Sequence, residues 1–168
     1  MKNGYLYLAL LILTACNSDL EKVHYNASKA KAAVLQSIDE SYALNAQESD
    51  ETAITFVWEN PVINYPAAMT TDLQMDIQGN HFAKASILAS TKTDSTYSIS
   101  TADLNAALIK LQTTNGLDFG PIPVDFRLAS SLSVAAVPLY SNTVSSIITP
   151  FAGEREYPQI WIIGDYCG

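Results

Sequence analysis

The sequence predicts an all-β domain with the architecture of a two-layer sandwich, and three observations carry this prediction. About seven or eight short segments alternate apolar with polar residues, and turn residues separate them at intervals of roughly 8–14 residues. The chain of 168 residues is 48% hydrophobic and only 15% charged, so it can bury a core. Glycine is sparse, at seven residues, while threonine and serine are abundant, which suits strands joined by ordinary turns.

The N-terminus has the features of a secretion signal. Lys2 supplies a positive charge, Tyr5 to Leu13 form an apolar run, and small residues lead into Cys16. A run of this length covers only about 14 Å as a helix, too short to cross a bilayer. The ending Leu13-Thr14-Ala15-Cys16 is similar to a bacterial lipobox, in which the cysteine is acylated. We therefore expect residues 1–15 to be a lipoprotein signal peptide and Cys16 to be the lipidation site; an ordinary cleaved signal peptide is the alternative.

Residues 16–30 are polar and aperiodic, which predicts a lipid-anchored tether.

The net charge of the chain argues against several kinds of partner. The formal net charge of −8 argues against nucleic-acid binding and against electrostatic adhesion to anionic lipid. The acyl chains are therefore the expected membrane contact. If Cys16 is acylated, the other cysteine, Cys167, is left without a partner in this chain.

The first strands are predicted from apolar alternation. Residues Ala32 to Leu35 and Tyr42 to Leu44 together predict one broken edge strand. Thr52 to Glu59 alternate with a period of two, which predicts a strand that ends at the dipeptide Asn60-Pro61. Its core face consists of Ile54, Phe56 and Trp58.

The clearest alternation lies between Thr71 and Gln78, where one face is apolar and the other polar, as in an antiparallel sheet with one wet face. A turn is predicted at Gly79-Asn80, and Phe82 to Ala89 are predicted to resume the sheet. Tyr97 and Ile99 mark a further short strand. The predicted core residues of the Thr71–Gln78 strand are Leu73, Met75 and Ile77, and its predicted solvated residues are Asp72, Gln74, Asp76 and Gln78.

One amphipathic helix interrupts the strands. Leucines recur at i, i+4 and i+7 over residues 102–112, with a capping box from Ser100 to Asp103 at the start and Asn115-Gly116 at the end. Val124 to Leu128 and Val137 to Ile148 are the last predicted strands. The leucines are Leu104, Leu108 and Leu111.

These elements define one domain over residues 31–151. A buried Trp58 on an early strand favours an immunoglobulin or fibronectin type III relative, with the helix between late strands as a departure; a barrel is the alternative. Residues 152–168 are predicted to be a charged hinge followed by the first strand, Tyr157 to Ile163, of a second and truncated domain.

Five segments, taken in their order along the chain, are Leu73-Gln74-Met75-Asp76, Gly79-Asn80-x-Phe82, Thr101-Ala102-Asp103-Leu104-Asn105, Leu139-Tyr140-Ser141-Asn142 and Pro158-Gln159-Ile160-Trp161-Ile162-Ile163-Gly164-Asp165. The first four resemble the N-terminal domain of SusE-like proteins, surface lipoproteins of starch-utilisation systems, and the last is similar to the start of a starch-binding domain. The resemblance implies a fibronectin-like domain after the anchor, with starch-binding sandwich domains beyond it. It also implies an outer-membrane, cell-surface location, glycan capture without catalysis, and a porin-type transporter with its glycan-binding lid as partner.

The candidate carbohydrate-binding residues are Trp161 and Tyr166, because sugars need aromatic rings beside polar groups. The family's glycan contacts lie in later domains, so the resemblance assigns no ligand residue here. Asp72 and Asp76 share a strand face about 13 Å apart, too far for a retaining carboxylate pair, and are expected to be solvated. The two histidines, His24 and His81, form no triad or metal cluster, and we expect neither catalysis nor a cofactor.

The expected function is a non-catalytic surface lipoprotein that assists starch or maltooligosaccharide capture, with this chain as anchor and spacer. Two alternatives remain open. An adhesion or assembly module would bind another protein by strand addition and needs a long, uncharged edge strand. An accessory domain of a surface glycoside hydrolase needs a downstream carboxylate pair.

Overall fold

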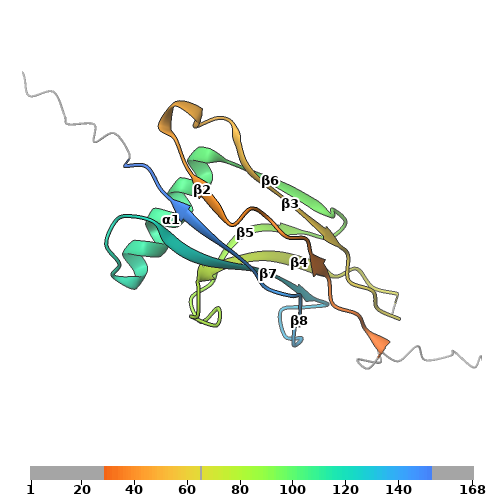
Figure 1. Cartoon of the computed structure of the whole chain (residues 1–168). Helices are drawn as coiled ribbons and strands as arrows, with labels where there is room; N and C mark the ends of the chain where they lie inside the picture. Colours follow the sequence, from red (N-terminus) through yellow and green to blue (C-terminus); the bar gives the residue numbers. More distant parts are fainter. Residues whose placement is uncertain (1–28, 65, 153–168) are drawn as a thin grey trace, which may run out of the picture.

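The computed structural model describes residues 29–64 and 66–152, and these form two β-sheets that face each other across one apolar core (Figure 1). The smaller sheet has the order β1-β3-β6 and the larger has the order β2-β9-β7-β4-β5, with β8 paired to β7. The predicted all-β sandwich with one short helix is confirmed. The strands of the smaller sheet are β1 (Val34–Leu35), β3 (Thr52–Glu59) and β6 (Thr96–Ser100), and those of the larger are β2 (Ser41–Ala43), β4 (Thr70–Ile77), β5 (Ser86–Thr91), β7 (Ile122–Ser131), β8 (Leu139–Tyr140) and β9 (Val144–Thr149).

The core is built from the strands whose apolar residues alternate most regularly. Each such strand directs one set of side chains between the sheets, because successive side chains point to opposite faces. The predicted core face of β3, including Trp58, is buried as expected, and Leu73 and Met75 of β4 are buried with it. Outside the helix, the buried core residues are Ala33, just before β1, and the strand residues Leu35, Ile54, Phe56, Trp58, Leu73, Met75, Ile99, Ile122, Val124, Phe126, Leu128 and Ile148.

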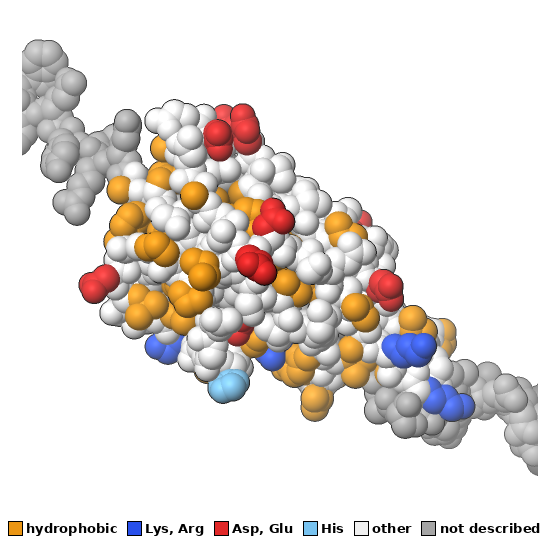
Figure 2. Space-filling view, viewed as in Figure 1, with side chains coloured by type: hydrophobic (Ala, Val, Ile, Leu, Met, Phe, Trp, Pro, Cys, Tyr) orange, Lys and Arg blue, Asp and Glu red, His pale blue; other side chains and the backbone are white. Residues whose placement is uncertain are grey.

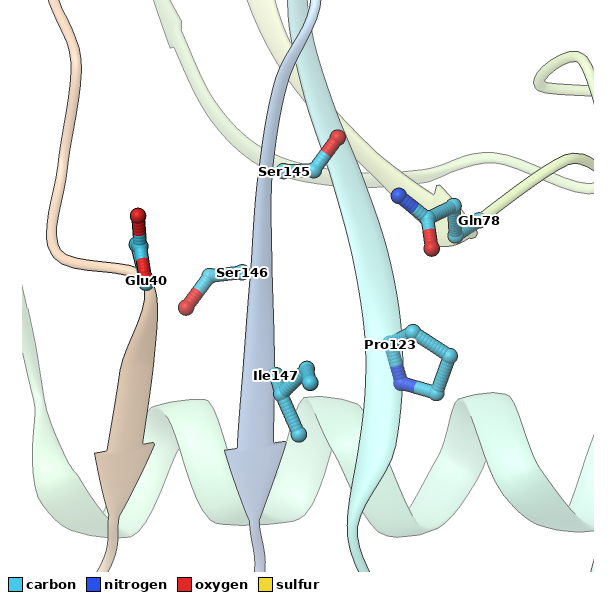
Figure 3. Close-up of a pocket in the computed structure, with 6 residues that line it drawn as sticks. All are labelled: Glu40, Gln78, Pro123, Ser145, Ser146 and Ile147. Carbon is cyan, nitrogen blue, oxygen red and sulfur yellow. The ribbon is translucent and has the colours of Figure 1, made fainter.

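Helix α1 (Thr101–Asn115) carries the chain from the smaller sheet to the larger and confirms the predicted helix, with additional residues at each end. The Ser100 hydroxyl accepts a hydrogen bond from the Asp103 amide at 3.1 Å, which caps the first turn. Gly116 ends the helix at φ 65°, a left-handed conformation that glycine adopts without strain. The helix runs across the strand direction behind β2, β9 and β7 (Figure 3). Its three leucines, Leu104, Leu108 and Leu111, complete the core.

Three predicted boundaries are wrong. The broken edge strand is in fact two strands in opposite sheets, since β1 pairs with β3 and β2 pairs with β9. The strand predicted from Phe82 begins at Ser86, because the preceding residues form an extended turn. The strand predicted over Val137–Ile148 is divided into β8 and β9.

The division between β8 and β9 has a clear physical cause. The side chain of Asn142 forms two hydrogen bonds of 2.9 Å with the backbone of Leu35, one to its N–H and one to its carbonyl. An amide side chain thus takes the place of a neighbouring strand beside β1. This pairing ties Asn142 to the smaller sheet, while the preceding Ser141 stays hydrogen-bonded to Leu128 of β7 in the larger sheet.

Candidate binding surface

The outer face of the larger sheet carries an arginine enclosed by two aromatic rings. Arg127 on β7 lies opposite Gln74 on β4, and its Nε donates a hydrogen bond of 2.8 Å to Gln74 Oε1. The guanidinium carbon lies 4.0 Å from the ring centroid of Phe82 and 3.9 Å from that of Tyr140. Both distances are within the range of cation–π attraction. The guanidinium plane is therefore held on both sides and along one edge.

Burial lowers the pKa of Arg127, and the nearby Tyr140 and Asp76 act in the opposite direction. Because the side chain is partly buried, its charge has lost part of its hydration. Arginine nevertheless remains protonated under all ordinary conditions because its intrinsic pKa is so high. The surface thus presents a fixed positive charge that is incompletely solvated.

The turn between β4 and β5 positions the Phe82 ring. His81 and Phe82 both have left-handed backbone conformations, with φ of 53° and 59°. Such values are uncommon for residues other than glycine and cost on the order of 1–3 kcal/mol each. The surrounding contacts must therefore hold this turn in place.

Asp76 supplies these contacts, and its predicted exposure is wrong: the residue is 0% exposed. Its carboxylate accepts hydrogen bonds from Asn80 Nδ2 at 3.1 and 3.0 Å, from the Lys84 amide at 3.1 Å and from the Ile77 amide at 2.8 Å. Charge-assisted hydrogen bonds of this kind are stronger than neutral ones and compensate for burial. The turn folds back over the sheet face, and this is why a residue on the polar side of β4 becomes buried.

Two hollows lie elsewhere on the domain. One, of about 170 Å³, opens between β2, β9 and the start of β7 (Figure 3). The other, of about 280 Å³, lies beside the segment that follows β3, near Asn60 and Met69. Among the described residues that line them, neither hollow has an aromatic ring on which a sugar could stack. The first is lined by Glu40, Gln78, Pro123, Ser145, Ser146 and Ile147.

The site residues predicted from sequence, Cys16, Trp161 and Tyr166, lie outside the described residues. Within residues 29–64 and 66–152, no group of three or more histidine, cysteine, aspartate or glutamate side chains is placed to hold a metal ion. No helix of this described part is long and apolar enough to cross a membrane. Sequence reasoning missed the enclosure of Arg127, although Phe82 and Tyr140 both belong to segments that carried the family resemblance.

Fold and surface together define a class of protein: a β-sandwich domain with a polar and aromatic outer sheet face. In Figure 2, the viewed face is largely uncharged, with apolar side chains interspersed among a few acidic and basic ones.

The chain belongs to the SusE outer membrane protein family, whose model matches residues 18–129, more than half of the sequence. The resemblance found in the sequence is thereby confirmed. Proteins of this family are non-catalytic surface components of outer-membrane starch-utilisation systems. Comparisons with curated proteins and with solved structures gave no match.

Proposed function

We propose that this chain is a lipid-anchored, non-catalytic surface protein that assists the capture of starch or maltooligosaccharides, and that residues 31–151 serve as its spacer domain. The family supports the setting, and one observation on the fold supports the spacer role. The described chain enters the sandwich at one end, near β1, and leaves it after β9 at the opposite end (Figure 1). A domain with its termini at opposite ends keeps the segment before it apart from the segment after it.

The anchor in this proposal is Cys16, acylated after removal of residues 1–15. Residues 16–30 then form the tether, and the sandwich adds its own length. The eight residues of β3 alone span about 27 Å at 3.4 Å per residue. Binding domains beyond residue 152 would be held away from the bilayer. A glycan retained there stays near a porin-type transporter at a raised effective concentration.

We also propose that the sandwich is of the immunoglobulin or fibronectin type III kind. The strand order supports this, because such sandwiches divide their strands into one sheet containing the first, second and fifth strands and another built around the third and the last two. Here β1, β3 and β6 form one sheet, and β4, β7 and β9 are neighbours in the other. The helix between β6 and β7 is the departure from that plan.

Glycan contact is assigned to domains beyond residue 168, and Trp161 and Tyr166 are the weaker candidates within this chain. Residues 17–168 and the longest available gene product should be titrated in parallel with maltooligosaccharides and starch. Binding by the longer protein alone is expected and would support the spacer role. Binding by residues 17–168 that is lost in both Trp161→Ala and Tyr166→Ala would relocate the site into this chain, whereas absence of binding by either protein would contradict glycan capture.

A second candidate function is assembly with another protein by strand addition. It is favoured by β5, an edge strand of the larger sheet whose sequence Ser-Ile-Leu-Ala-Ser-Thr carries no charge. Edge strands without charged residues are open to pairing with an added strand. Replacing the exposed Ile87 by lysine should abolish such an association and leave glycan capture intact.

A further inference from the structure

Arg127 is held in one orientation, and within the described part of the chain no carboxylate forms a salt bridge with it, although Asp76 is near enough to act on its charge. Its guanidinium is fixed between the Phe82 and Tyr140 rings, and Gln74 accepts its Nε–H. The two Nη groups form no salt bridge with a carboxylate in the described part of the chain. A guanidinium held in one orientation binds a carboxylate well, because its planar fork matches both oxygens and little side-chain entropy remains to be lost.

The enclosure of Arg127 requires strain elsewhere in the fold. Phe82 reaches the guanidinium only because the turn holds two consecutive non-glycine residues, His81 and Phe82, in the left-handed region. The buried carboxylate of Asp76 is used to hold that turn. Strain of this kind persists where the surrounding structure enforces it, and it is concentrated at functional sites.

The neighbouring groups restrict what the ligand can be. Three carboxylates lie on the same two strands: Asp76 acts on the charge of Arg127, Asp72 accepts a hydrogen bond from Ser90, and Asp125 accepts one from Ser145. They would repel a polyanion such as an acidic polysaccharide, so a ligand for Arg127 should carry no more than a single carboxylate. Ile87, which is 58% exposed, lies beside Gln74, and the loop that leads to Tyr140 carries two more exposed apolar side chains, Val134 and Val137.

We propose that this face is a docking site for a partner protein that inserts one aspartate or glutamate side chain at Arg127 and lays apolar residues against Ile87, Val134 and Val137. Arginine and tyrosine at the centre with apolar residues around them is the composition of protein-interface hot spots. The inference goes beyond the proposed glycan capture and does not depend on it, because the site lies in the spacer domain.

The test uses the full chain in its native outer membrane, with the photocrosslinker p-benzoylphenylalanine in place of Ile87. The same crosslinker in place of Val57, which is exposed on the opposite sheet, is the positional control. A discrete adduct with another protein is expected from position 87 and not from position 57. The crosslinked partner peptide should contain or adjoin an aspartate or glutamate.

Arg127→Gln should lower the yield of this adduct about tenfold or more, because truncating one member of a partly buried charge pair is costly. Lys110→Gln removes the same charge from the exposed surface of α1 and should leave the yield unchanged. A urea-unfolding midpoint for each variant shows whether the fold is kept. If Arg127→Gln does not fold, the crosslinker protein that keeps Arg127 gives a second readout. Its adduct yield should fall several-fold between about 0.05 M and about 0.5 M NaCl, because salt screens the attraction between Arg127 and the partner's carboxylate.

Three results would overturn the proposal. One is the absence of a protein adduct at position 87. Another is an adduct whose yield is insensitive to both Arg127→Gln and salt. The third is an adduct only with a glycan or with a second copy of the chain, which would assign the arginine to a different occupant. In the supporting case, neutralising the partner's carboxylate by an amide substitution should reproduce the loss seen with Arg127→Gln.

Discussion

Phe56 and Phe126 contact each other across the centre of the sandwich, with ring centroids 5.0 Å apart and ring planes tilted by 52°. Phe56 comes from β3 in the smaller sheet and Phe126 from β7 in the larger, and both are fully buried. Tilted aromatic pairs at this separation are favourable beyond the area that they bury. This pair therefore joins the two layers of the domain directly.

Replacing Phe126 by alanine should lower the free energy of unfolding by about 3–5 kcal/mol, because the contact is lost and a cavity remains between the sheets. Urea denaturation measures the loss. Val57→Ala is the matched control, since Val57 adjoins Phe56 on β3 but is 37% exposed, and it should cost less than about 1 kcal/mol. Equal losses for the two variants would contradict the assignment of the core.

Asp76→Ala should lower the free energy of unfolding by about 2–4 kcal/mol, because Asn80, Lys84 and Ile77 all lose a buried acceptor. Asp72→Ala on the same strand face should cost less than about 1 kcal/mol, since Asp72 is only partly buried and accepts from the exposed Ser90. Unfolding in urea compares the two. If Asp72→Ala proved the more costly, Asp76 would not be what holds the turn.

Asn105→Ala should loosen the chain at Phe151, where it leaves the domain. The Asn105 side chain pairs with both polar groups of the Phe151 backbone, at 2.9 Å from the N–H and 3.1 Å to the carbonyl. Removing the Asn105 side chain should lower the free energy of unfolding by about 1–3 kcal/mol and raise the hydrogen-exchange rate of the Phe151 amide. Lys110→Ala on the same helix should leave that rate unchanged. Continued protection of Phe151 in Asn105→Ala would show that other contacts hold this segment.

Cys16→Ala should move the protein from the membrane fraction to the soluble fraction, because the acyl chains are the proposed attachment. Cys167→Ala, the only other cysteine variant that the chain allows, should leave the partition unchanged. Immunoblots of separated membranes measure both. Retention of Cys16→Ala in the membrane would contradict the proposed anchor.

Much of the fold could be predicted because apolar and polar residues that alternate with a period of two show directly which face of a strand is buried. This reasoning identified β3, β4 and β7 and the burial of Trp58, and the spacing of the leucines identified α1. Alternation does not say which strand lies beside which. Residues Ala32 to Leu35 and Tyr42 to Leu44 were therefore predicted as one broken edge strand, whereas β1 and β2 belong to different sheets.

The candidate surface could not be predicted because its parts meet only in the folded chain. Phe82 comes from a turn, Arg127 from β7 and Tyr140 from β8, and no local pattern connects them. The burial of Asp76 has the same origin, since a polar position on an alternating strand predicts exposure unless a loop folds over it. An aspartate followed four residues later by Asn80, after a turn glycine, was the one local signal of such a loop.

The parallel pairing of β2 with β9 has a mechanical consequence. A force that separates the two ends of the described chain enters near β1, upstream of β2, and leaves through β9. Because β2 and β9 run parallel, such a force would load the hydrogen bonds between them together in shear rather than break them one after another. These two strands of the larger sheet would then resist extension as a unit.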